Sequence, residues 1–473
     1  MDIFQSKNYM KGFIPYAFAA FLIGIAGGLS TVLGPSFVQD MRLPYNNTTW
    51  TALAQAISTA ACAPILGRLL DLLGRRTTLL SGIGIFTIGN LLSALAPSLL
   101  FMLFARFVVG IGMAAIAPTI MSYIVTEFPP KETAKGFSLY MLISSAAVIF
   151  GPSLGGLIIN IFSWRILIWI NVALSLFFLI LCFFTCPKTD FSPKKIDSFD
   201  IKGSIFVFLF FSFLLCIPSF GQNFGWLSFS FIVVLLLSIF SLIGLILSEK
   251  SARNPILSRE FMQRKTFILP VIILFLTQGL MQANMTNIIV FVNYTQPDNT
   301  VISGYAISIM YLGMSLGSIL LGPLSDRFEP KQILTVSLFL TAVGCGIMLL
   351  FSKTASLLML AASLGILGFG LGANAAIFMK IVLSDLPEGT VGFSTGIYGL
   401  FRDLAAPFGV AVFVPMFTNR ITQLVADNTV NLSAAFAAVK SIHMLAIIEL
   451  CCIAIGIIIV QLLPKIHQKQ HTN

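Results

Sequence analysis

Charged residues are scarce in this chain of 473 amino acids: they make up only 10% of it, against about 25% in an ordinary soluble protein. Hydrophobic residues make up 57%, and the mean hydropathy is +0.96. The shortage of charge excludes a soluble enzyme. The excess of apolar residues excludes a disordered chain, which needs low hydrophobicity and high net charge. The composition therefore indicates a protein embedded in a lipid bilayer.

Metal ligands and disulfide partners are also scarce. The sequence has three histidines, and its seven cysteines are scattered without the spacing of a zinc site or a disulfide framework. It has no phosphate-binding loop and no grouping of Ser, His and Asp that resembles a catalytic site. We therefore expect no enzymatic activity, no metal and no cofactor.

Long apolar runs, in contrast, fill the chain. A bilayer core needs about 20 mostly apolar residues per helix, and the sequence accommodates fourteen such runs. They lie at roughly 12–34, 49–66, 78–96, 100–123, 137–161, 165–186, 203–221, 228–248, 267–292, 302–322, 332–351, 357–383, 392–417 and 441–463. Each is predicted to be a helix, because backbone groups in lipid must be satisfied within the segment. The first run is too long for the core of a signal peptide, so we expect a mature helix there.

The basic residues predict the orientation, because they collect on the cytoplasmic side of membrane proteins. With both termini on one side, that side holds 21 of the 28 Lys and Arg, and the membrane holds Arg106 and Arg402. We therefore expect a multi-pass protein of the bacterial cell membrane with both termini in the cytoplasm. Its net charge of +10 is then explained by basic loops against anionic lipid headgroups, without a nucleic-acid partner.

An internal repeat organises the predicted helices. One offset of 255 residues places Gly67 on Gly322, Asp71 on Asp326, Arg76 on Lys331, Gly110 on Gly365 and Pro152 on Pro407. The repeat predicts two six-helix bundles, at 1–186 and 266–473, the second with a short cytoplasmic tail. Residues 187–265 form a linker with two additional helices. Two such bundles are typical of a transporter whose halves rock around a substrate near the bilayer midplane. We expect a monomer.

The loop after the second run carries Gly67, Asp71, Gly74, Arg75 and Arg76. This pattern resembles the G-x-L-x-D-x-x-G-R-K/R signature of the major facilitator superfamily. Glycines permit a tight turn, and Asp71 can cap a neighbouring helix and pair with Arg75, so we expect a gate here. A merely basic, orienting loop would explain Arg75 and Arg76 but not Asp71 between glycines. The second copy is degenerate, since Glu329 replaces a glycine, so a weaker gate is expected at Asp326.

The fifth run carries Gly151, Pro152, Gly155 and Gly156, which resemble the G-P-x-x-G-G motif of drug/proton antiporters in the same superfamily. Such small residues let helices approach closely, so we expect packing and not binding. Together with fourteen crossings, the motif implies the fourteen-helix antiporter branch. That branch usually has an acidic residue in the first helix, where this chain has Ala26. The missing carboxylate weakens the prediction of a transporter for cationic drugs.

Arg106 is the main candidate for binding an anionic substrate. It lies in an apolar run within a pattern that resembles the superfamily's R-x-x-x-G motif, and an arginine inside a membrane is costly unless it faces a cavity or a partner. The alternative is an arginine at a helix end that extends to the membrane surface. Arg402 is the second candidate, because Asp403 beside it competes for its charge.

Few carboxylates are expected within the membrane. Only Asp403 and Glu449 lie inside predicted helices. If Arg402 neutralises Asp403, then Glu449 is the remaining carboxylate, and an apolar surround favours its protonated form. We therefore predict Glu449 as the proton-coupling residue, with Asp403 second. An anionic, largely apolar substrate moving with protons fits this set of charges.

The ninth run adds five polar side chains that are predicted to line the substrate cavity: Gln278, Gln282, Asn284, Thr286 and Asn287. Gln278, Gln282 and Thr286 follow one another at intervals of four and so form one stripe along a helix. Such groups bond either to another helix or to a hydroxylated ligand.

The whole chain also resembles the proton-dependent bile-acid uptake transporters of anaerobic gut bacteria, most closely in the stretches 45–50, 216–223 and 277–287. This resemblance implies uptake of unconjugated, cholate-like bile acids with protons by alternating access, and we take it as the first expectation. The alternative is a multidrug/proton antiporter that exports amphipathic compounds. A membrane sensor or an enzyme embedded in the bilayer has no supporting residues.

Overall fold

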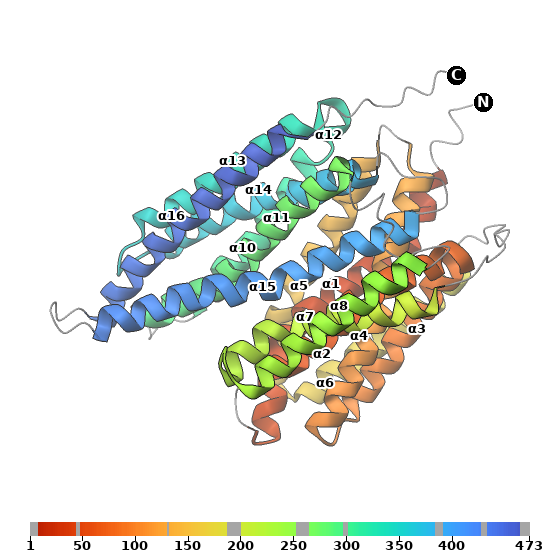
Figure 1. The fold of residues 1–473 in the computed structure, drawn as a ribbon, viewed down its shortest axis with the longest axis horizontal. Helices are drawn as coiled ribbons and strands as arrows, with labels where there is room; N and C mark the ends of the chain where they lie inside the picture. The colour runs from red at the N-terminus through yellow and green to blue at the C-terminus, as the bar shows by residue number, and fades with distance from the viewer. Residues whose placement is uncertain are drawn as a thin grey trace. The chain divides into compact units, whose positions relative to one another are not determined.

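The computed structural model of the chain describes residues 8–43, 48–129, 132–186, 200–251, 264–296, 301–383, 391–426 and 433–463. Within these ranges the chain is helical and has no strand, and the helices are long (Figure 1).

Fourteen of the helices in the described ranges have 18 or more residues. In chain order they are α1 (Asn8–Asp40), α2 (Thr48–Leu73), α3 (Arg75–Ala94), α4 (Leu99–Glu127), α5 (Thr133–Ile161), α6 (Trp164–Thr185), α7 (Ile201–Phe224), α8 (Phe229–Ser251), α10 (Lys265–Thr295), α11 (Val301–Leu321), α13 (Pro330–Ile347), α14 (Leu357–Leu383), α15 (Val391–Ala426) and α16 (Ala434–Gln461). Two short elements, α12 (Leu324–Arg327) and the 3₁₀ turn η5 (Met348–Leu350), flank α13.

These helices confirm the predicted all-α membrane fold. Thirteen of them are long and apolar enough to cross a bilayer; the apolar stretch of α5 is Thr133–Ile149 over the side chains that the structure describes. The helices extend past the predicted runs at several ends. The first run was predicted to end at 34 and the thirteenth at 417, whereas α1 continues to Asp40 and α15 to Ala426. Hydropathy marks only the part of a helix inside the lipid, and hydrogen bonding carries a helix beyond it.

The chain forms two compact units. The first contains residues 1–130, 143–262 and 386–404, and the second contains 131–142, 263–385 and 405–473. The first ten described residues of α5 therefore belong to the second unit, and the first part of α15 belongs to the first. The predicted boundaries at 186 and 265 stay a prediction.

The two units repeat one packing plan. In the first unit, α4 packs against α1, α2 and α3, and α6 packs against α1 and α3. In the second unit, α14 packs against α10, α11 and α13, and α16 packs against α10 and α13. The same offset of 255 residues relates two glycines, Gly89 and Gly344, at which neighbouring helices approach closely. A Cβ on Gly89 of α3 would lie 2.5 Å from the backbone nitrogen of Val109 on α4, and one on Gly344 of α13 would lie 2.6 Å from that of Leu367 on α14.

The additional helices α7 and α8 pack against each other, and α7 packs along α2 of the first unit. The outer face of α8 is strongly apolar and exposed, at Leu236, Phe240 and Leu247 for example. Asp200 starts α7 as an N-cap, because its Oδ1 accepts a hydrogen bond from the backbone N–H of Gly203 at 2.8 Å.

Candidate functional site

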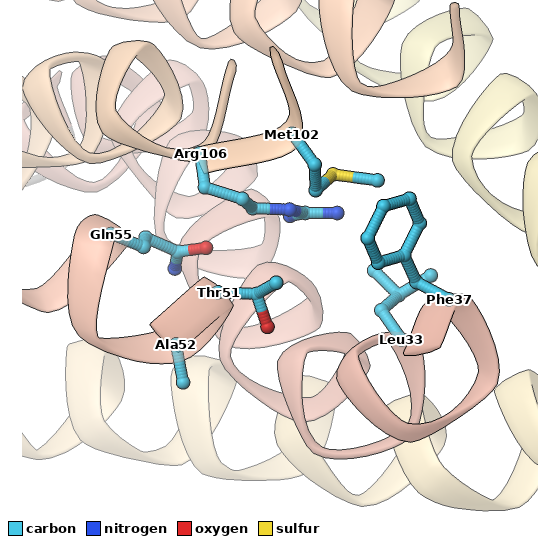
Figure 2. A pocket seen from close by; sticks show the side chains of 7 residues that line it. All are labelled: Leu33, Phe37, Thr51, Ala52, Gln55, Met102 and Arg106. Carbon is cyan, nitrogen blue, oxygen red and sulfur yellow. The ribbon is translucent and has the colours of Figure 1, made fainter. Parts of the chain in front are cut away.

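Arg106 lies on α4 of the first unit, about 10 Å from the start of the helix at a rise of 1.5 Å per residue. Its guanidinium points into a cavity between α1, α2 and α4 (Figure 2). The lining residues are Leu33, Phe37, Thr51, Ala52, Gln55, Met102 and Arg106. The space open to the centre of a water molecule is about 10 Å³, which corresponds to room for about one water. The cavity is therefore small, mostly apolar and positively charged.

The guanidinium of Arg106 is buried and incompletely paired. Only 5% of the residue is exposed, which favours an arginine that faces the cavity over one that extends to the membrane surface. Its Nη2 has no hydrogen-bond partner within the described residues. Because an unpaired buried charge costs several kcal/mol, this nitrogen is a natural position for the oxygen of an anion or of a water.

The wall of this cavity is fixed by contacts at the end of α1. Phe37 meets the ring of Trp164 edge to face, with 5.3 Å between centroids. Asp40 Oδ2 accepts hydrogen bonds from Trp164 Nε1 at 2.9 Å and from Arg165 Nη1 at 3.0 Å. The hydrogen bond from Trp164, together with Arg165, lowers the pKa of the Asp40 carboxyl below its usual value. This Asp40 clasp joins α1 to α6 and holds Phe37 over Arg106.

Glu449 lies on α16 of the second unit and is fully buried. Its Oε2 accepts a hydrogen bond from Asn284 Nδ2 on α10 at 3.1 Å, and the thiol of Cys345 on α13 lies beside the carboxyl. Its Oε1 accepts no hydrogen bond in the part of the chain that the structure describes. The carboxyl is therefore enclosed between three helices, with an amide and a thiol as neighbours and one oxygen available for a proton.

The five polar residues of α10 divide between two faces of the helix. Asn284 and Asn287 are buried, at 1% and 0% exposure, and Asn284 contacts Glu449. Gln278, Gln282 and Thr286 are half-buried on another face. The structure therefore joins Asn284 to the candidate proton site. The amide of Asn287 makes no hydrogen bond among the described residues. Lining of a substrate cavity by these residues stays a prediction.

Arg402 and Asp403 form an ion pair on α15, with 2.9 Å between Nε and Oδ1. Both side chains are 21% exposed and lie in the first unit. An arginine that already binds a carboxylate attracts a second one less strongly. The pair therefore leaves Arg106 as the stronger candidate for substrate binding.

In the first copy of the gating motif only Gly74 forms the turn between α2 and α3; Gly67 and Asp71 lie inside α2 and not in a loop as predicted, because the helix continues past the apolar run to Leu73. Gly74 has φ +83°, a conformation that L side chains rarely adopt, so the turn requires a glycine. Arg75 pairs with Glu127 at the end of α4, with 2.5 Å between Nη2 and Oε1. Arg76 donates to the carbonyl of Phe183 at 2.9 Å. Gly67 is buried, and Asp71 is half-buried and also takes part in a polar contact.

The second copy of the motif makes several contacts. Asp326 Oδ1 lies 2.7 Å from Lys380 Nζ, and the carboxylate also accepts hydrogen bonds from the backbone N–H groups of Ala134 at 3.2 Å and Lys135 at 3.1 Å. These two N–H groups belong to the first turn of α5, where the helix dipole favours a negative charge. All of these residues belong to the second unit. The predicted order of gate strength stays a prediction.

The glycine and proline motif of the fifth run lies within the continuous helix α5. Gly155 is buried. The side-chain surroundings of Gly151, Pro152 and Gly156 lie outside what the structure describes, so their role in packing stays a prediction.

Two partners at these sites could not be predicted from local patterns: Cys345 and Lys380. A weak signal exists for Cys345, since the offset of 255 places it on Asn90, and Asn90 Oδ1 accepts a hydrogen bond from Asn171 of α6 at 3.2 Å. The α3–α6 contact and the α13–α16 contact thus both contain buried polar side chains. Among the described residues, no group of three His, Cys, Asp or Glu could hold a metal ion.

Comparison with known proteins identifies the family. The model of the Major Facilitator Superfamily matches residues 16–410. Multidrug resistance protein 3 of Bacillus subtilis is 24% identical over 403 residues, which cover 84% of this chain and 77% of that protein. The multidrug resistance protein Stp of Mycobacterium tuberculosis is 23% identical, over 86% and 76% of the two chains. A probable multidrug resistance protein of Escherichia coli, EmrY, is also 23% identical, over 86% and 80%.

Solved structures of transporters share this fold. The fucose:proton symporter of Escherichia coli superposes with a TM-score of 0.62 at 14% identity, covering 97% of this chain and 99% of that one. A human organic anion transporter superposes with a TM-score of 0.64 at 14% identity, covering 96% and 98%. The helices, their repeated packing and the family match lead to one conclusion: the chain belongs to the major facilitator superfamily and is a multi-pass membrane transporter.

Proposed function

We propose that this transporter moves amphipathic organic anions together with protons. Unconjugated bile acids, taken up into the cell, are the substrate class that we propose first. The observation that carries the proposal is the buried guanidinium of Arg106, whose Nη2 lacks a partner among the described residues. A carboxylate is the natural complement of this group, because two parallel N–H donors match its two oxygens.

The size of the Arg106 cavity supports binding of a head group and not of a whole substrate. Space for about one water suits a carboxylate that displaces that water. Phe37, Leu33 and Met102 supply apolar walls next to the charge. An anion with a large apolar body and one carboxylate fits this combination of walls and charge.

Glu449 is the proposed carrier of the proton. It is buried without a basic partner among the described residues, and its Oε1 accepts no hydrogen bond there. Asn284 adapts to either state, since its amide has both a donor and an acceptor. Asp403 is the weaker candidate, because it already forms an ion pair with Arg402.

A second candidate is export of amphipathic drug-like compounds in exchange for protons. The names of the relatives favour it: three that match over more than four fifths of this chain are described as multidrug resistance proteins. Ala26, in place of the acidic residue expected in the first helix, argues against cationic drugs as substrates. Amphipathic anions are compatible with either direction of transport.

Transport assays distinguish the two candidates. Cells that express the chain should accumulate labelled cholate, and a protonophore should abolish the accumulation if uptake is coupled to protons. Export would instead lower the cellular content of cholate or of a fluorescent dye, and a protonophore would raise it. Equal cholate content with and without the protein would contradict the bile-acid proposal.

A further inference from the structure

A second cavity in the first unit lies on the side of the α2–α4 pair that faces α7. It is an open groove with a volume of about 760 Å³. Its lining includes Trp50 and Ile57 on α2, Phe101, Phe104 and Phe107 on α4, and Cys216 on α7. Apart from the Ser98 hydroxyl at one end, the Trp50 indole N–H and the Cys216 thiol, the side chains that line the groove are apolar, so it suits neither a charged head group nor a metal.

The additional helix α7 bounds one side of the groove, where Cys216 lines it. Trp50 meets Phe220 of α7 edge to face at 5.3 Å between ring centroids, and Phe107 meets Phe208 of α7 at 6.0 Å. These two ring contacts join α7 to α2 and α4 and leave the groove beside them. Its rim is exposed, with Leu100 at 79% and Phe104 at 57%. Because α2, α4 and α7 are membrane spans, the medium that meets this rim is the hydrocarbon of the bilayer.

The length of the groove matches one leaflet. Along α4 it runs from Ser98 to Phe107, which is about 13 Å at 1.5 Å per residue. Half of a hydrocarbon core about 30 Å thick is about 15 Å. The groove therefore begins near the end of the helices and reaches the middle of the bilayer.

We propose that this groove retains the acyl chain of a phospholipid from the leaflet in which α4 begins. The chain fills the space between α2, α4 and α7 as a bound lipid, and it exchanges more slowly than the lipids around the protein. The bound chain also packs against the helices that form the Arg106 cavity, because the same stretches of α2 and α4 line both spaces. On α2, Thr51 and Gln55 face the cavity, whereas Trp50 and Ile57 face the groove.

Trp50 provides a direct probe. A variant that keeps Trp50, with Trp164→Phe, Trp169→Phe and Trp226→Phe, is placed in phosphatidylcholine with brominated acyl chains, which quench tryptophan, and is then diluted into unbrominated vesicles. A matched variant keeps only Trp169, which is 45% exposed on α6. We expect Trp169 to recover its fluorescence at once and Trp50 to recover several-fold more slowly. Equal recovery would overturn the proposal, and so would relief of Trp50 quenching by cholate below its micellar concentration, since that would make the occupant a substrate.

A second measurement leaves all tryptophans in place. Ala54 is half-buried and lines the groove, so Ala54→Phe fills part of the space. Val343→Phe enlarges a lipid-facing side chain on α13 of the other unit and serves as control. Native mass spectrometry of the purified proteins should find fewer retained phospholipids in Ala54→Phe than in the wild type, and an unchanged number in Val343→Phe. The same number in all three proteins would refute a bound lipid in the groove.

Discussion

At the scale of single residues, Arg106 and Glu449 define the proposed chemistry. Arg106 is a buried cation with an unpaired nitrogen among the described residues, and Glu449 is a buried acid held by an amide. They lie in different units. Binding and proton coupling are therefore separable by substitution.

Arg106→Ala should weaken substrate binding. A charge-assisted hydrogen bond in a dry cavity contributes about 1.5–3 kcal/mol, so the half-saturation concentration should rise about ten- to a hundredfold. Arg106→Lys should recover only part of the loss, because an ammonium lacks the planar fork of a guanidinium. The exposed Arg420 on α15 provides the control, since Arg420→Ala should leave half-saturation unchanged. Equal effects at both positions would remove Arg106 from the binding site.

Glu449→Gln should abolish accumulation driven by a proton gradient and leave exchange of labelled for unlabelled cholate, since glutamine keeps the shape but carries no exchangeable acid. Asn284→Leu should shift the pH dependence of transport, because it removes the hydrogen bond to Oε2. Glu329→Gln, at the start of α13, is the control, and it should leave accumulation driven by a proton gradient in place. Accumulation that survives in Glu449→Gln would direct attention to Asp403 or to transport of the protonated acid itself.

Arg106 begins only about six residues into an apolar run, so the sequence left open both a buried arginine and one that extends to the membrane surface. The structure places it at 5% exposure, which favours the buried arginine. The contact partners of the charged residues could not be predicted from the sequence, because contacts such as that of Lys380 with Asp326 depend on tertiary packing between distant helices. Periodicity alone separates Asn284 and Asn287, three residues apart on one face, from the stripe that begins at Gln278.

At the scale of helices, the fold followed from hydropathy, because each crossing must satisfy its own backbone. Hydropathy does not predict which helix ends contact one another. The Asp326 carboxylate at the N-terminus of α5 and the Asp40 clasp between α1 and α6 are two such contacts, and each can be tested separately.

Removal of the Asp326 charge should lower transport without loss of the protein from the membrane. Asp326→Asn and Lys380→Met remove the same ion pair, so the double variant should be little worse than either single one. Asp71→Asn, in the complete copy of the motif, should lower transport more than Asp326→Asn does. Additive losses at Asp326 and Lys380 would show that the pair is not the relevant contact, and equal losses in Asp71→Asn and Asp326→Asn would contradict an asymmetric gate.

The Asp40 clasp should depend on pH in one direction. The folded-state pKa of Asp40 is lowered from its usual value of 3.8. The charged carboxylate therefore stabilises the folded protein above pH 3.8, and this stabilisation is lost as the pH falls through the folded-state pKa. Asp40→Asn should therefore lower Tm by a constant amount from about pH 5 to pH 8, and the difference should shrink in stronger acid. Thermal unfolding of both proteins across this range measures it, and a difference that grows on acidification would contradict the assignment.

At the scale of the whole molecule, the expected orientation makes both termini cytoplasmic. Tags at residue 195 and after residue 473 should be accessible from the cytoplasm, and a tag at about residue 427 should be accessible from outside. Protease treatment of inside-out vesicles should remove the first two tags and spare the third. Protection of the first two would contradict the fourteen-helix topology.

The division of α15 between the units has a mechanical consequence. The boundary falls between Leu404 and Ala405, and Pro407 inside the helix cannot donate a hydrogen bond to the carbonyl of Asp403, four residues earlier. The helix therefore lacks one backbone hydrogen bond beside the Arg402–Asp403 pair. Because the two units share α15, a motion of one unit against the other bends this helix, and the missing hydrogen bond lowers the cost of a bend at this position.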